Sequence, residues 1–399
     1  MKNYLLHWLI AVVALMSGAV ALNLWVDPYG LYRTYGPGDV KPHSVTQGGL
    51  VKPYQVLRIS PRAIILGNSR SEVGFDPKDS AWPEPLRPVF NLALPGTGTR
   101  VDRRLFEHVE AVNPPRVIVL GVDFMDFLMS PDAEEGEPDI GNRLVVAPDG
   151  RPNSRRWRRM LEDGASTLIS LDAVFYSLDT LRQRGNDGAA TLTAAGFNPM
   201  KDYQRLVRDE GYFDFFRQRD IENIKAYQQR PKNLFTRGTL TSPAFDDISA
   251  ILDEADAHQI QVYVLIYPYH ANLLEILRLT GCWGLFEEWK RELVRRVAAH
   301  QRNHDVLWDF SGYHRYAQEP VPAAGDRKTE VRWYWEAGHF KKELGHEILQ
   351  CIFNGCDDSF GVKLTPNNVE EHLAAIQEEG RRYRGAHQTT VASLEGLVQ

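Results

Sequence analysis

Apolar residues form one long run at the start of the chain and only short runs after it. The long run extends from Tyr4 to Val26 and is interrupted only by His7, Ser17 and Asn23. A helix over this segment would be roughly 34 Å long at 1.5 Å per residue, enough to cross the hydrocarbon core of a bilayer. No later run approaches this length. The pattern therefore predicts at most one membrane span, followed by a globular body.

The charges beside this run predict its orientation. Lys2 precedes it and Asp27 follows it, so the positive-inside rule leaves the N-terminus in the cytoplasm and sends the rest of the chain across the membrane. Residues 1–26 are then a signal anchor in the cytoplasmic (inner) membrane, with the body in the periplasm or another extracytoplasmic space. A cleaved signal peptide, cut after residues 19–21 (Ala-Val-Ala), and a buried N-terminal helix are the alternatives. The apolar run continues past residue 21, which favours the anchor.

The short apolar runs alternate with segments of helical periodicity. Buried strands are predicted at 63–66, 89–94, 116–122, 261–267 and 306–310. Helices are predicted between and after them, at 96–112, 243–258, 284–300 and 338–353. Strands that alternate with helices favour a parallel sheet covered on both faces. The predicted fold class is α/β, a three-layer sandwich around a mainly parallel five-stranded sheet.

Composition divides the rest of the chain. Residues 27–60 are rich in Gly, Pro and Tyr and are interpreted as an irregular connector between membrane and body. The main domain covers residues 61–360 and contains a helical insertion at 151–240. Its Arg-rich segment 155–159 is interpreted as a solvated helix face rather than a contact with lipid headgroups or an acidic glycan. Residues 361–399 form a C-terminal extension, with one helix expected over 367–377 and a loose polar end.

Charge and cysteine content exclude several classes of protein. Lys and Arg number 46 against 52 Asp and Glu, a net charge of −6, so nucleic acid is not an expected partner. Three cysteines exclude a disulfide-built scaffold and leave at least one thiol free or paired between chains. No group of Cys and His has the spacing of a zinc site, and neither a metal nor another cofactor is expected.

Candidate chemistry gathers where the predicted strands end. Ligands of such sheets bind outside the carboxyl ends of the strands. The residues that follow the strands or precede the last core helix include Ser69, Gly96, Asp123, His270, Glu336 and His339. They contain the parts of a Ser-His-acid site, in which a histidine takes the proton of a serine and a carboxylate orients the histidine.

Roles follow from these positions. Ser69 sits in a tight turn after Gly67 as the proposed nucleophile, although a serine there can also be a simple helix cap. His339 is the expected general base and Glu336 the carboxylate that orients it. His270 is a rival base because it also follows a strand. The late position of His339, just before the last core helix, favours His339, and we expect Ser69, His339 and Glu336 to be joined by hydrogen bonds.

Three blocks carry a resemblance to a known family. The segment AIILGNSRSEVGFDP (63–77) resembles the first block of the SGNH/GDSL hydrolase superfamily, NLALPGTGT (91–99) the second, and EAGHF (336–340) the last, with glutamate in place of aspartate. The segment NLWVDPYG (23–30) is similar to exported, membrane-anchored members. The resemblance implies a flavodoxin-like SGNH fold, Ser69 as nucleophile, and the N–H of Gly96 as an oxyanion donor.

One position departs from the family pattern. Its third block, G-x-N-D, uses an asparagine as an oxyanion donor, whereas the matching segment 121–124 has Asp123 in that place. An ionised carboxylate would oppose an oxyanion, and loss of one such donor costs roughly 3–4 kcal/mol in other hydrolases. Either another group donates, with Arg70 as a candidate, or Asp123 is protonated, or the site is weak. Arg70 can equally pair with Asp123 in a structural role.

The resemblance implies two functions that belong to different classes. The first is an exported serine ester hydrolase or O-acyltransferase, acting on an acyl ester, most plausibly the O-acetyl group, of an envelope or secreted polysaccharide. The alternative is a catalytically weak or inactive SGNH-like subunit that binds or scaffolds within a glycan biosynthesis or export assembly. In both cases the expected partners are a polysaccharide, the membrane through residues 4–26, and other envelope glycan-assembly proteins.

Overall fold

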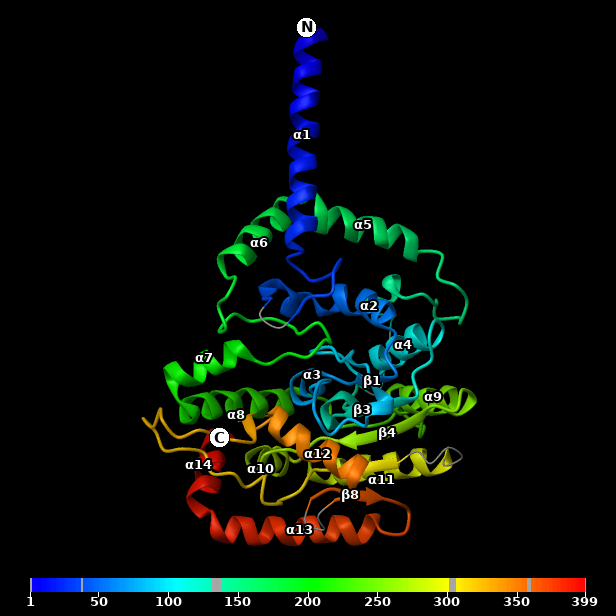
Figure 1. Ribbon diagram of the computed structural model, residues 1–399. Helices are drawn as coiled ribbons and strands as arrows, with labels where there is room; N and C mark the ends of the chain where they lie inside the picture. Colours follow the sequence, from blue (N-terminus) through cyan, green and yellow to red (C-terminus); the bar gives the residue numbers. More distant parts are fainter. Residues whose placement is uncertain are drawn as a thin grey trace.

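The computed structural model describes residues 2–36, 39–130, 132, 136, 138–300, 306–356 and 360–398. Helix α1 (Lys2–Val26) projects from one end of a body that holds the rest of the described chain (Figure 1). The segment Asn3–Val26 of α1 is long and apolar enough to cross a membrane, and little of it is buried against the body. This agrees with the predicted location of the one candidate span.

The body is organised around a mixed six-stranded sheet in the order β2-β1-β3-β4-β5-β8. Its strands are β1 (Ala63–Leu66), β2 (Val89–Asn91), β3 (Val117–Val122), β4 (Gln261–Ile266), β5 (Val306–Asp309) and β8 (Val362–Leu364). The five predicted strands all belong to this sheet, and their neighbours pair in parallel. The predicted number of strands was wrong, because β8 adds an antiparallel edge beside β5.

Burial explains why five strands were predictable and one was not. Every residue of β1, β2 and β3 is buried, and strands covered on both faces are continuous apolar runs. By contrast, β8 is only three residues long and one of them, Lys363, is exposed. Such a short edge strand has no sequence pattern of its own.

Two groups of helices pack on the sheet. The first contains α4 (Thr99–Glu110), α9 (Pro243–Ala257) and α11 (Trp283–Ala299), of which α9 contacts both others. The second contains α3 (Ser69–Gly74) and α12 (Lys342–Asn354). Gly345 of α12 permits this contact, because a Cβ there would clash with the backbone carbonyl of Gly74. The second group matters for the site, since α3 begins with Ser69.

The insertion is helical and outside the sheet, as predicted. It contains α5 (Arg156–Leu168), α6 (Leu171–Arg182), α7 (Lys201–Glu210) and α8 (Tyr212–Gln229). These helices do not behave alike. Helix α8 buries Phe216 and Tyr227 in the main core, whereas α5 and α6 contact α1.

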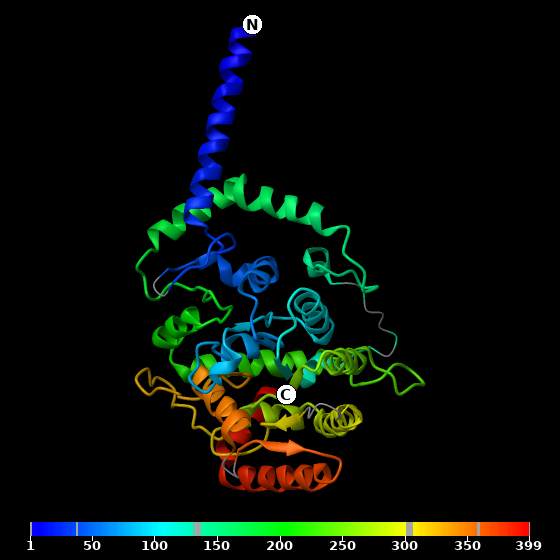
Figure 2. The ribbon, with the colours of Figure 1, turned by 45° about the vertical axis from the view of Figure 1, so that its right-hand side comes forward.

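Both ends of the body are more ordered than the sequence indicated. The second part of the expected connector forms helix α2 (Gly48–Ile59), whose Lys52 is buried and paired with Glu72. At the other end, α13 (Val369–Ala386) continues well beyond residue 377, and α14 (Gln388–Val398) follows it. The expected loose end was wrong because α14 buries Val391 and Leu394 against α8 and α10 (Ala271–Leu279). Figure 2 shows α13 at the end of the body opposite α1.

A small hairpin replaces the start of the helix predicted at 338–353. Strands β6 (Tyr334–Glu336) and β7 (His339–Phe340) pair antiparallel, and α12 begins only at Lys342. Aromatic residues favour strands, and Ala337-Gly338 supplies the tight turn between them. Further along, Cys351 and Cys356 form a disulfide, whereas Cys282 is a buried free thiol.

Candidate functional site

The turn between β1 and α3 presents Ser69. Gly67 has a φ of +127°, and a Cβ there would clash with the hydroxyl of Tyr267, so the turn requires glycine. Asn68 caps α3, since its side chain accepts a hydrogen bond from the Arg70 amide at 3.0 Å. Ser69 is therefore not the cap of this helix, and that alternative was wrong.

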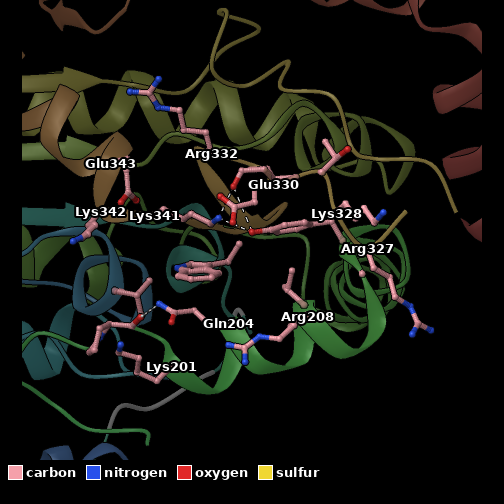
Figure 3. A pocket seen from close by; sticks show the side chains of 18 of the residues that line it. Lys201, Gln204, Arg208, Arg327, Lys328, Glu330, Arg332, Lys341, Lys342 and Glu343 are labelled. Atoms are coloured by element: carbon pink, nitrogen blue, oxygen red, sulfur yellow. Dashed lines mark hydrogen bonds between the residues drawn. The ribbon is translucent and has the colours of Figure 1, made fainter. Parts of the chain in front are cut away.

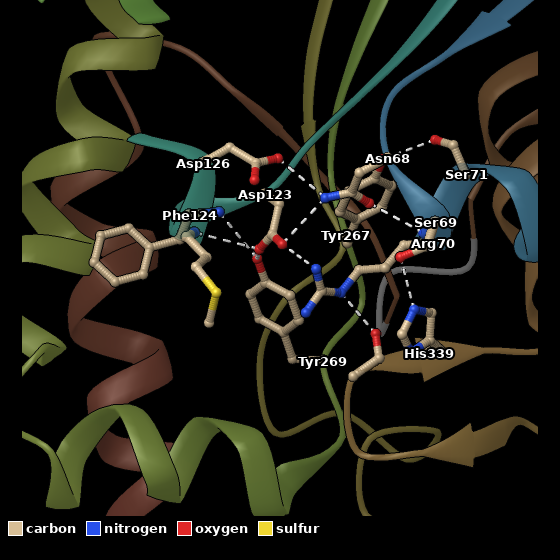
Figure 4. A network of polar contacts seen from close by, with 12 residues as sticks. Asn68, Ser69, Arg70, Ser71, Asp123, Phe124, Asp126, Tyr267, Tyr269 and His339 are labelled. Atoms are coloured by element: carbon tan, nitrogen blue, oxygen red, sulfur yellow. Dashed lines mark hydrogen bonds and ion pairs between the residues drawn. The ribbon is translucent and has the colours of Figure 1, made fainter. Parts of the chain in front are cut away.

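The hairpin brings a histidine and a carboxylate to this serine. Ser69 Oγ lies 2.8 Å from His339 Nε2 (Figure 4). On the other side of the ring, His339 Nδ1 hydrogen-bonds to Oε1 of Glu336, its partner across the hairpin. The second oxygen of Glu336 accepts the Gly338 amide at 2.8 Å. The expected chain of contacts is present, although residues 69 and 339 are 270 positions apart in the sequence.

Electrostatics fix the state of this carboxylate. Burial raises the pKa of Glu336, but the imidazole of His339, the Gly338 amide and Arg70 together lower it to about 2. An ionised Glu336 favours the tautomer in which Nδ1 carries the proton, so that Nε2 can accept from Ser69. Ser69 and His339 are only partly buried, and a reactant can therefore approach them.

The side chain of Asp123 points into a buried network of polar contacts. Its carboxylate forms an ion pair with the guanidinium of Arg70. It also accepts from Asn68 Nδ2 at 3.2 Å and from the Tyr269 hydroxyl at 2.7 Å (Figure 4). Burial lowers the pKa of Arg70, but Asp123 raises it above its usual range, and the pair is ionised. Asp123 therefore does not lie as an unpaired charge beside Ser69.

Arg70 joins three segments and has little freedom to serve as an oxyanion donor. Its Nε donates to the Gly338 carbonyl at 2.6 Å, and its Nη1 donates to Asp123. Its guanidinium also lies 5.5 Å from the ring centroid of Tyr269. Of the two roles considered for Arg70, the structure shows the pairing with Asp123.

Asp126 follows β3 together with Asp123 and belongs to the same region, although the sequence assigned it no role. Asn68 Nδ2 donates to its carboxyl group at 3.0 Å, and its Cβ lies beside Gly98 in the turn after β2. Burial and the nearby Asp123 raise the pKa of Asp126 to about 8. A protonated Asp126 is a hydrogen-bond donor at neutral pH. In the sequence, the feature that indicates Asp126 is its position three residues after Asp123, beyond the end of β3.

The structure separates His270 from this group. His270 is buried and caps α10, its Nδ1 accepting the Asn272 amide at 3.2 Å. Its Nε2 lies 2.8 Å from the carbonyl oxygen of Glu319. Burial lowers the pKa of His270 to about 4. Both ring nitrogens are occupied, so the rival base is a structural residue.

Gly96 lies exposed in the turn after β2, at the same end of the sheet as Ser69. It has a φ of +70°, which favours glycine at this position. The parallel pairing of β1 with β2 brings the two turns to one edge. The oxyanion role of Gly96 stays a prediction.

A cavity of about 690 Å³ lies beside the hairpin. Three of its lining residues are close in sequence to the Ser-His-acid group. Val73 lies one helical turn after Ser69, Trp335 precedes Glu336, and Lys341 lies two residues after His339. Its basic side chains come from α7, the segment 327–332 and the start of α12: Lys201, Arg208, Arg327, Lys328, Arg332, Lys341 and Lys342 (Figure 3). Glu330 and Glu343 are its acidic residues. We call this cavity the basic cleft.

Lys341 is held in place within the basic cleft. Its Nζ donates to the Tyr212 hydroxyl at 2.6 Å and lies 4.5 Å from the ring centroid of Trp335. The other basic residues of the cleft, most of them exposed, form no ion pair with a carboxylate of the described chain. The sequence did not reveal the cleft because these residues come from three separate segments.

Asp123→Asn should destabilise the protein and should not increase ester turnover. The change leaves the buried Arg70 without its counter-charge, and removal of one partner of a buried pair costs roughly 3–5 kcal/mol. Denaturant unfolding of the purified full chain in detergent measures this loss. Asp132→Asn, which removes the exposed partner of Arg237, is the matched control and should change stability by less than about 1 kcal/mol. Unchanged stability with faster turnover would contradict the structural role.

Glu336→Gln should lower the stability of the protein at pH 7, and the difference in stability between variant and parent should become smaller in acid. The pKa of Glu336 in the folded protein, about 2, lies below the ordinary 4.5. Above pH 4.5 the ionised carboxylate therefore adds roughly 3 kcal/mol to the free energy of unfolding, and this contribution is lost as the pH falls towards 2. Thermal unfolding between pH 7 and pH 3 follows the difference between variant and parent. Glu343→Gln, on exposed α12 surface, should show no such trend. A deficit that is independent of pH would argue against the ionised pair.

Comparison of the sequence with known proteins does not identify a family for this chain. No family model matches the chain, and no curated protein matches its sequence. The chemistry of the site must therefore be inferred from its own residues and their contacts.

Proposed function

We propose that this chain is an exported, SGNH-like serine ester hydrolase or O-acyltransferase that acts on an envelope or secreted polysaccharide. The observation that carries the proposal is the hydrogen-bonded chain Ser69–His339–Glu336 at the carboxyl ends of the strands. The order of the five parallel strands, β2-β1-β3-β4-β5, is that of flavodoxin-like sheets, which bind ligands between their first and third strands. Ser69 follows β1, and Asp123 follows β3.

The contacts support a two-step acyl transfer. Ser69 Oγ attacks the ester carbonyl carbon and gives its proton to His339 Nε2, while Glu336 stabilises the imidazolium. The tetrahedral intermediate collapses, His339 returns the proton to the leaving alcohol oxygen, and the acyl group stays on Ser69. Water or a sugar hydroxyl then gives its proton to His339 and attacks the acyl carbon. As the second intermediate collapses, His339 returns this proton to Ser69 Oγ, which frees Ser69 and releases an acid or a new ester.

The oxyanion of each intermediate needs donors, and backbone groups are the best candidates. The amide of Ser69 opens α3, and the amide of Gly96 lies in the neighbouring turn. Because Arg70, Asn68 and Tyr269 neutralise and bind Asp123, its negative charge does not oppose the oxyanion directly. The aspartate in place of the family's asparagine is then compatible with catalysis.

The basic cleft supports an acidic polysaccharide as the substrate. Seven basic side chains against two acidic ones beside the triad attract a polymer that carries carboxylates. A single-pass anchor through α1 would hold the site in the periplasm, where such polymers are assembled by other envelope proteins. The cleft would equally serve a non-catalytic glycan-binding subunit, which is the second candidate function.

Labelling of Ser69 separates the two candidates. A fluorophosphonate probe should react with the full chain, and Ser69→Ala should abolish both labelling and p-nitrophenyl acetate hydrolysis. His339→Asn should slow hydrolysis by about 10²–10⁴-fold, the usual contribution of a general base. Ser170→Ala, which removes a serine of the α5–α6 junction, is the control and should label normally. A folded parent chain that neither labels nor hydrolyses the ester would favour the binding subunit.

Charge reversal in the basic cleft should change the use of polymer but not of small esters. Lys328→Glu combined with Arg332→Glu should raise KM for an O-acetylated, carboxylate-bearing glycan roughly tenfold, because like charges then face each other. Kinetics with p-nitrophenyl acetate should stay unchanged. Lys225→Glu, an exposed position on α8 outside the cleft, is the control. Equal loss with both substrates would mean that the double variant damages the triad instead.

A further inference from the structure

Helices α5 and α6 are attached to the foot of α1. Both Figures 1 and 2 show them lying across the end of α1 where it enters the body. Asn23 of α1 donates to the Leu168 carbonyl at 2.9 Å, and Ser177 donates to Asn23 at 2.7 Å. One buried polar side chain of α1 therefore fixes the end of α5 and the middle of α6. Whatever surrounds the rest of α1 comes close to these two helices.

Helix α5 buries a polar side chain and exposes two of its largest apolar ones. On the inner side, Asp163 is buried and accepts from Tyr54 Oη and Arg143 Nε, each at 2.8 Å. On the outer side, Trp157 is 66% exposed and Leu161 is 65% exposed. Their spacing of four residues places them on one face of the helix. This is the reverse of the pattern expected for a helix on a water-soluble surface.

Helix α6 likewise buries small or polar residues and exposes large apolar ones. Its buried residues are small or polar: Ala173, Ser177 and Thr180. Its large apolar residues point outward, with Leu171 76%, Phe175 65% and Leu178 51% exposed. Two adjoining helices with exposed apolar faces form a continuous candidate contact surface, and such surfaces on soluble proteins mark interaction sites.

We propose that α5 and α6 form a platform that lies in the interfacial region of the lipid bilayer, in the leaflet from which α1 emerges. The occupant is lipid because the platform adjoins the one helix of the described chain that can span a membrane. Trp25 at the end of α1 is 60% exposed, and exposed tryptophans such as Trp25 and Trp157 favour the membrane–water boundary. Amphipathic helices lie in this plane with their apolar faces among the acyl chains.

The basic residues at the start of α5 fit the same occupant. Arg155 and Arg158 are exposed next to Trp157, and Arg158 pairs with Glu162 at 2.9 Å. Long basic side chains such as that of Arg155 can reach lipid phosphates while the neighbouring apolar residues insert. The segment 155–159, interpreted from sequence as a solvated helix face, becomes the headgroup-facing edge of the platform. This proposal does not depend on the chemistry at Ser69.

Spin labels on the full chain in nanodiscs of phosphatidylcholine and phosphatidylglycerol test the proposal. The variants Leu161→Cys and Phe175→Cys report on the platform, and Arg382→Cys on α13, at the end of the body opposite α1, is the control. The native thiol of Cys282 is buried and does not compete for the label. Collisions with oxygen, which concentrates in lipid, and with a water-soluble nickel chelate measure the surroundings of each label.

At positions 161 and 175 we expect at least fivefold fewer collisions with nickel than at 382, together with more collisions with oxygen. Collisions with nickel equal to those at 382 would place the platform in water and overturn the proposal. Exclusion of both reagents would also overturn it, because protein would then cover the surface. Magnetic broadening between labels on two chains would identify that protein as a second copy.

Discussion

The buried ion pair between Arg70 and Asp123 is the contact on which the arrangement of the site depends. Arg70 follows Ser69 on α3, Asp123 ends β3, and the same guanidinium holds the Gly338 carbonyl in the turn of the hairpin. Ser69 and His339 come from segments that share no local structure, and Arg70 adds a second polar link between these segments beside the Ser69–His339 hydrogen bond. Removal of two charges from water is costly, and here the cost is offset by Asn68 and Tyr269, which complete the bonding of Asp123.

This constraint explains a residue that looked unfavourable for catalysis. A neutral asparagine in place of Asp123 would supply an amide donor but would remove the counter-charge that the buried guanidinium binds directly. The carboxylate therefore has a structural reason to be present, independent of the chemistry at Ser69. Under the proposed function, oxyanion stabilisation then falls to backbone amides.

Local pattern predicted the elements that are covered on both faces, and topology predicted the meeting of Ser69 with His339 at one edge of the sheet. The pattern could not separate His270 from His339, because both follow strands and only tertiary contacts show that both nitrogens of His270 are occupied. It also missed β8 and α14, which are stabilised by packing rather than by propensity. The basic cleft is formed by residues from three segments that are distant in the sequence. The net charge of the chain, −6, gives no indication of such a local excess of basic residues.

The inverted helices of the insertion show a further limit of local pattern. A hydrophobic stripe on α5 or α6 predicts burial, but not whether the covering medium is protein or lipid. Only the direction of the buried Asp163 and Ser177 shows that the stripes face away from the body. A single spanning helix lets a domain tilt and turn, whereas a second attachment in the membrane plane restricts both motions. The platform would therefore hold the body, with Ser69 and the basic cleft, in one orientation relative to the membrane.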